Sequence, residues 1–131
     1  MQPISRELVQ RRIDQLAGQS VYLHLETTQG VYQARQGDGP LASAYVRNVP
    51  IRFERGEIKG DGPYRVGLKL AQGWIYCDGL TDWEPDEERL LLAGHDREGR
   101  LVAALQLSQT PFATPRQSLK SPPLFLEEGE K

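Results

Sequence analysis

The chain has 131 residues, which is enough for one domain with a hydrophobic core of its own. Its 16 basic and 18 acidic side chains give a net charge of −2, whereas nucleic-acid-binding domains are normally basic. The hydrophobic fraction of 38% and the charged fraction of 26% are typical of a folded globular protein. We therefore expect one globular domain that does not bind nucleic acid.

The cysteine content and the N-terminal residues indicate a cellular location. Cys77 is the only cysteine, so no internal disulfide can form, and small secreted domains usually carry several. The first residues lack the charged and then apolar run of a signal peptide. No apolar run approaches the roughly 18 residues that cross a membrane. We expect a cytoplasmic protein that does not contact a membrane.

The first expected element is a helix that begins after Ser5 and stops at Gly18. A serine can cap the N-terminus of a helix, and a glycine commonly ends one. The apolar residues of this segment recur at roughly helical spacing: Ile4, Leu8, Ile13, Leu16 and Ala17. We expect an amphipathic helix that lies on a sheet.

From residue 20 onward, apolar residues alternate with polar ones, which is the period of a β-strand. The strands are expected at roughly 20–28, 31–36, 42–54, 57–60, 64–71, 74–79, 89–96 and 100–108. Short polar turns end in Gly30, Gly56, Gly73 and Gly99, and a glycine with positive φ closes such hairpins. The fold class is therefore mostly β: an antiparallel meander forming a barrel-like or strongly curled sheet, with one N-terminal helix.

Prolines and acidic residues mark the irregular parts of the chain. Pro50 interrupts the longest expected strand, which predicts a bend, a bulge or a sheet edge there. The acidic segment 82–88 is expected to be a loop with Trp83 folded back onto the body. Four prolines after residue 110 forbid regular structure. We predict a single domain over 1–112 and a Pro-rich C-terminal strap or tail over 113–131.

Six sequence strings occur together in this chain. They are DQLA at 14–17, VYLHLETT at 21–28, AYVRN at 44–48, GPYRVGLK at 62–69, LAGHD at 92–96 and ALQLS at 104–108. In this combination the chain resembles the YojF-like family of small proteins from Bacillus-type bacteria. The resemblance implies a compact β-barrel-like fold with no assigned activity and no established functional residues. It also implies a link to bacillithiol metabolism, through neighbouring genes for a deacetylase of bacillithiol synthesis.

His24 and Glu26 lie two residues apart on one expected strand face, with Tyr22 before them. An imidazole beside a carboxylate can perform acid–base chemistry or begin a metal site. The spacing matches no metal motif, so we predict neither a metal nor a cofactor. The structural alternative is a polar sheet face with cross-strand pairing.

The middle of the chain is locally basic, and two of its arginines, Arg47 and Arg65, lie on strand faces. An arginine there can bind a carboxylate or a phosphate with two parallel hydrogen bonds. The alternative is a solvated face balanced by Glu54 and Glu57. If a ligand site exists, its candidate residues are Tyr22, His24, Glu26, Arg47 and Arg65.

Two further positions have a chemical and a structural interpretation. His95 and Asp96 could form an acid–base pair, although an aspartate before a glycine turn usually bonds its own backbone. Cys77 could be a nucleophile, but a cysteine in a strand is usually a buried, inert apolar residue.

Two function classes remain open. The first is a non-catalytic binding or accessory protein for a small anionic metabolite or a partner enzyme. The second is a small enzyme that uses His24 and Glu26 with an arginine clamp. A homodimer is also considered. Convergence of these side chains on one concave site would favour the enzyme, and a flat arrangement would favour the binding protein.

Overall fold

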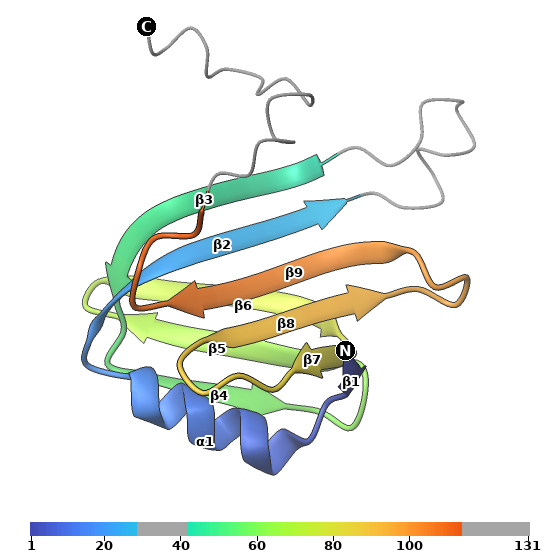
Figure 1. Cartoon of the computed structure of the whole chain (residues 1–131), viewed down its shortest axis with the longest axis horizontal. Helices are drawn as coiled ribbons and strands as arrows, with labels where there is room; N and C mark the ends of the chain where they lie inside the picture. Colours follow the sequence, from blue (N-terminus) through green and yellow to red (C-terminus); the bar gives the residue numbers. More distant parts are fainter. Residues whose placement is uncertain (29–41, 114–131) are drawn as a thin grey trace, which may run out of the picture.

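The computed structural model of the chain describes residues 1–28 and 42–113, which form two antiparallel sheets and one helix (Figure 1). The elements are β1 (Gln2–Pro3), α1 (Arg6–Leu16), β2 (Ser20–Thr28), β3 (Ala42–Arg52), β4 (Arg55–Lys59), β5 (Tyr64–Leu70), β6 (Gly73–Leu80), β7 (Asp82–Glu84), β8 (Leu90–His95) and β9 (Leu101–Ser108). One sheet has the order β1-β7-β8-β9-β2-β3, and the other has the order β4-β5-β6.

Helix α1 begins and ends close to the expected positions. The Ser5 hydroxyl accepts a hydrogen bond from the Leu8 N–H at 3.3 Å, and Gly18 has a φ of 81°. The buried face of the helix consists of Val9, Ile13 and Leu16, so the assignment of Leu8 to this face was wrong. Residues 9, 13 and 16 are spaced four and three positions apart, so they lie on one face of the helix, and residue 8 lies outside that face. Within the described part of the chain, no helix has the length and apolar character needed to cross a membrane.

The chain passes from the larger sheet to the smaller one at Phe53, between β3 and β4. The Phe53 side chain is completely buried, and its carbonyl accepts a hydrogen bond from the Gly18 N–H at 2.8 Å. Strand β3 forms an edge of the larger sheet, as Pro50 predicted, and its pairing with β2 is irregular at Asn48. Asn48 has a φ of 57°, a conformation that asparagine tolerates better than most residues.

The hydrophobic core lies between the two sheets and α1, which contacts β4 and β8. Strand β6 of the smaller sheet packs against β8 and β9 of the larger one. At one point this packing brings two backbones together, because the carbonyl oxygen of Gly79 in β6 lies directly over Gly94 in β8. A side chain at position 94 has no room there.

The mostly β class, the antiparallel pairing and the single helix are confirmed. The barrel is not: among residues 1–28 and 42–113, neither sheet closes on itself, and the two stack face to face. The expected loop at 82–88 was partly wrong, because Asp82–Glu84 forms β7 between β1 and β8, with Trp83 buried. The expected strand 31–36 lies outside the described residues.

The prediction of positive φ is confirmed only at Gly99, whose φ is 80°. It was wrong for Gly56 and Gly73, and Gly30 lies outside the described residues. Gly56 is inside β4, where a Cβ atom would lie 2.7 Å from Ile13 Cγ2. A glycine is needed at position 56 because α1 packs closely on the strand, and not because a turn forms there.

Candidate functional site

The outer face of the larger sheet carries three of the predicted site residues on one strand. Tyr22, His24 and Glu26 of β2 lie opposite alternate residues of β9, without a register shift between them. On the other side of β2, His24 is paired with Arg47 of β3. The structure therefore brings His24, Glu26 and Arg47 together, because all three lie on the same face of neighbouring strands.

The His24 imidazole lies between a cation and an anion. Its Nδ1 is 3.2 Å from Arg47 Nη1, and its Nε2 is 3.4 Å from Glu26 Oε1. A guanidinium can only donate hydrogen bonds, so Nδ1 acts as the acceptor in the neutral ring. The proton of the neutral imidazole is then on Nε2, directed toward the Glu26 carboxylate.

A short segment after β9, residues 109–113, crosses this face from β9 to β3, and we call it the cover segment (Figure 1). The Phe112 ring lies 6.3 Å from the His24 ring and 5.5 Å from the Arg47 guanidinium carbon. The Asn48 side chain donates to the Phe112 carbonyl at 3.0 Å and accepts from the Phe112 N–H at 2.7 Å. Arg47 Nη2 donates to the Ala113 carbonyl at 2.8 Å.

The cover segment leaves His24 only 7% exposed. Burial lowers the pKa of His24 below its ordinary value of 6.5, and the positive charge of Arg47 lowers it further, while Glu26 acts in the opposite direction. The imidazole is therefore neutral near pH 7, and protonation works against this packing.

We expect acid to destabilise the protein through His24. Because the folded-state pKa lies below the unfolded value of 6.5, the unfolded chain binds more protons in between, and the free energy of unfolding falls as pH falls. Denaturant unfolding between about pH 7.5 and 5 measures this slope. His24→Gln should flatten it. An unchanged slope in that variant would show that another group is responsible.

The carboxylates with lowered pKa values do not interfere with this measurement of His24. Asp78, Asp82, Asp86 and Asp96 all have pKa values below their ordinary 3.8, because each accepts hydrogen bonds from its neighbours. Their contribution to stability is lost only at a pH below the window used for His24.

The two remaining predicted site residues, Arg65 and Tyr22, form no hydrogen bond with the cluster among the described residues. Arg65 belongs to β5 of the smaller sheet and bonds the Asp78 carboxylate at 2.7 and 3.1 Å. Tyr22 lies two residues before His24 on the same face of β2, where it is paired with Pro50 and Ser108. Sequence reasoning missed Asn48 and did not connect Phe112 with His24. The position of Asn48 and Phe112 relative to His24 depends on the register of the β2–β3 pair, which is irregular at Asn48.

His95 forms its pair with a different aspartate from the one considered. Its Nδ1 lies 3.0 Å from Asp82 Oδ1, and Asp82 also accepts a hydrogen bond from the Thr81 hydroxyl at 2.6 Å. Asp96 instead accepts from the backbone N–H groups of Glu98 and Arg100, as the turn interpretation predicted. Asp82 was missed because 13 residues separate it from His95 in the sequence.

Cys77 is buried in the core, and burial raises the pKa of its thiol to about 11. Only the thiolate is nucleophilic, so we expect iodoacetamide at pH 8 to leave the folded protein unlabelled and to label it in denaturant. Mass spectrometry of the intact chain measures both states. Rapid labelling of the folded protein would contradict the burial of this side chain.

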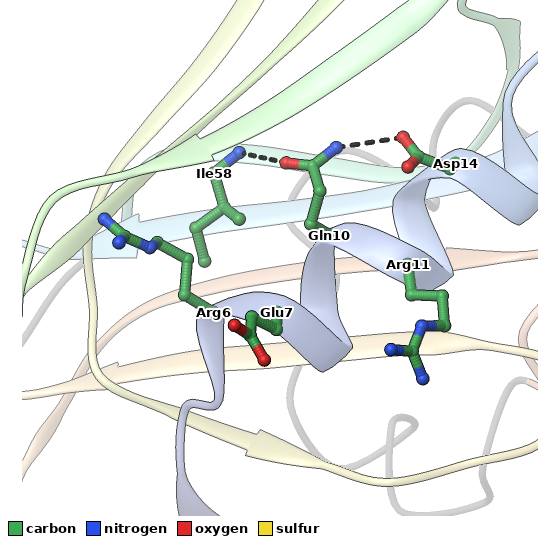
Figure 2. Close-up of a pocket in the computed structure, with 6 residues that line it drawn as sticks. All are labelled: Arg6, Glu7, Gln10, Arg11, Asp14 and Ile58. Atoms are coloured by element: carbon green, nitrogen blue, oxygen red, sulfur yellow. Dashed lines mark hydrogen bonds between the residues drawn. The ribbon is translucent and has the colours of Figure 1, made fainter.

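Two surface hollows of the described region are formed without His24, Glu26 or Arg47. One, of about 370 Å³, runs along α1 and is lined mainly by charged and amide side chains (Figure 2). There Gln10 accepts from the Ile58 N–H and donates to the Gly56 carbonyl and to Asp14, so it covers the free edge of β4. The other hollow, of about 600 Å³, lies beside Asp86 and Ser108.

In residues 1–28 and 42–113, no group of three or more His, Cys, Asp or Glu side chains is placed so that it could hold a metal ion. His24 with Glu26 and His95 with Asp82 are therefore isolated pairs, and each falls short of the protein ligands that a zinc site uses.

Comparison with known proteins shows which family the chain is similar to. Residues 3–112 match the family model described as "Protein of unknown function (DUF1806)". The chain is 47% identical over 114 residues to the uncharacterised protein YojF of Bacillus subtilis (strain 168), covering 86% of this chain and 98% of that protein. The crystal structure of B. subtilis YojF matches with a TM-score of 0.72 at 45% identity, over 86% of this chain and 97% of that one. The resemblance seen in the sequence strings is confirmed.

Proposed function

The chain belongs to the DUF1806 family of proteins of unknown function, and from the geometry of this member we propose that it is a non-catalytic binding or accessory protein. Its ligand is a small anionic metabolite, or an anionic group of a partner enzyme, and the binding residue is Arg47. The link to bacillithiol metabolism that the family resemblance implies makes metabolites of that pathway the first compounds to test.

One observation carries the proposal: the half-buried Arg47 guanidinium bonds only neutral acceptors in the described part of the chain. These are the neutral His24 ring and the Ala113 carbonyl. A carboxylate or phosphate forms stronger, charge-assisted hydrogen bonds with a guanidinium than a carbonyl does. An anion that reaches Arg47 can therefore displace the end of the cover segment.

The enzyme alternative receives less support from the same contacts. A general base needs access to a substrate proton, and His24 is 7% exposed beneath Phe112. Its Nδ1 faces Arg47 and its Nε2 faces Glu26, so both ring nitrogens already have partners. Arg65, the other predicted clamp, is held by Asp78 in the smaller sheet.

Native mass spectrometry of the purified protein, with and without a low-molecular-weight cell extract, tests the proposal. We expect a retained anion on the wild-type protein and its loss from Arg47→Ala. The matched control is Arg97→Ala, which removes an exposed arginine in the turn between β8 and β9. The same spectra count the subunits and so test the homodimer.

Ligand retention is compared only between variants that are folded, so that a loss of binding is not a loss of structure. Equal retention by wild type, Arg47→Ala and His24→Gln, all with folded circular dichroism spectra, would place the site elsewhere. Turnover of a retained compound that is lost in His24→Gln would favour the enzyme over the binding protein.

A further inference from the structure

The outer face of the smaller sheet carries a stack of four side chains. The rings of Trp74 and Tyr76 are 5.5 Å apart and within 5° of parallel. The guanidinium carbon of Arg55 lies 5.3 Å from the Trp74 ring centroid, and that of Arg65 lies 5.1 Å from the Tyr76 ring centroid. The aromatic pair stands over Gly67, where a Cβ atom would lie 2.8 Å from Tyr76 Cε1.

The two ends of this stack differ in how their charge is neutralised. Arg65 bonds the Asp78 carboxylate through Nε at 2.7 Å and Nη2 at 3.1 Å. Arg55 makes no ion pair with any carboxylate in residues 1–28 and 42–113, although it is stacked in the same way. The Asp78 pair therefore shows how an anion binds a stacked guanidinium, and Arg55 has no such carboxylate partner among the described residues.

A second cation lies beside Arg55. Lys69 is directly opposite Arg55 in the β4–β5 pairing and opposite Trp74 in the β5–β6 pairing. Its ammonium group donates to the Leu70 carbonyl at 2.7 Å, which leaves its charge without a carboxylate in the described residues. The nearby Glu57 pairs instead with Lys59 at 3.7 Å. This face thus holds four basic and two acidic side chains on a chain of net charge −2.

We propose that Arg55 and Lys69 bind the phosphate or carboxylate of a small ligand whose flat, apolar body lies against the exposed edges of Trp74 and Tyr76. Trp74 is 40% exposed and Tyr76 is 52% exposed, so both offer apolar surface next to the two cations. Stacking on Trp74 restricts the Arg55 side chain before the ligand arrives, which reduces the conformational entropy lost on binding. This site is on the other sheet from Arg47 and does not depend on the function proposed there.

Tryptophan fluorescence tests the site, because Trp74 is exposed while Trp83 is only 6% exposed. Titration with phenyl phosphate should change the Trp74 emission and saturate at lower concentration than inorganic phosphate does in calorimetry. Arg55→Gln should weaken phenyl phosphate binding by about tenfold, because a charge-assisted hydrogen bond is lost. Trp74→Phe should abolish the signal while calorimetry still detects binding.

Two variants of the same face serve as controls. Lys59→Gln removes a cation that is already paired with Glu57 and should leave the affinity unchanged. Asp78→Asn releases Arg65 from its carboxylate and should strengthen binding or add a second equivalent of phenyl phosphate. Equal affinity in wild type and folded Arg55→Gln would overturn the proposal. An equal loss in Lys59→Gln would also overturn it, because it would reduce the effect to net charge.

Discussion

Gly94→Ala is expected to destabilise the protein by about 3 kcal/mol or more, since the new methyl group meets backbone that cannot move aside. The added Cβ would fall well inside van der Waals contact with the Gly79 carbonyl oxygen and would also lie 3.4 Å from Ala103 Cβ. Gly94 does not have a positive φ, so the loss comes from the steric clash between β6 and β8. Denaturant unfolding followed by circular dichroism measures the loss.

Alanine substitutions at two other glycines serve as controls, because they separate the steric clash at position 94 from the backbone effect of replacing a glycine. Gly79 has a φ of 79° and open space around it, so Gly79→Ala should cost about 1 kcal/mol. Gly73 has open space and no positive φ, so Gly73→Ala should leave the midpoint unchanged or raise it slightly. A Gly94→Ala variant as stable as Gly73→Ala would mean that the sheets do not meet at this point.

The sequence predicted the parts of the fold that local patterns determine. Ser5 and Gly18 bound the helix, and the alternation from Val21 onward marks β2, because both signals depend only on neighbouring residues. The short strand around Trp83 was read as a loop because its flanking acidic residues obscure any apolar alternation. The need for glycine at position 56 also escaped prediction, since it arises from a helix that packs on it from elsewhere in the chain.

The candidate site was predictable only in part for a similar reason. Alternation alone places His24 and Glu26 on one face, but it does not say which arginine lies across the sheet. Arg65 is excluded because β5 belongs to the other sheet, and Arg47 lies opposite His24 because the β2–β3 register shifts by one residue at Asn48. A one-residue shift reverses which side chains share a face, so the pairing cannot be deduced from either strand by itself.

Asn48→Ala is expected to cost about 3 kcal/mol through two separate effects. An alanine is strained at a φ of 57°, and the Phe112 N–H and carbonyl lose their partners in the Asn48 side chain. Asn48→Gly keeps the backbone conformation at low steric cost but still loses both hydrogen bonds, so it should cost less than Asn48→Ala. The difference between the two variants, from denaturant unfolding, isolates the backbone strain.

Both Asn48 variants should also change the titration of His24. Without the Asn48 amide, residues 109–113 retain fewer contacts with β3, and the Phe112 ring is free to leave the imidazole. Water then reaches His24, which removes the main cause of its lowered pKa and moves that pKa back toward 6.5. An NMR titration of the imidazole protons, assigned with His24→Gln, measures this shift. A His24 pKa that stays at its wild-type value in both variants would show that the cover segment is held in place without Asn48.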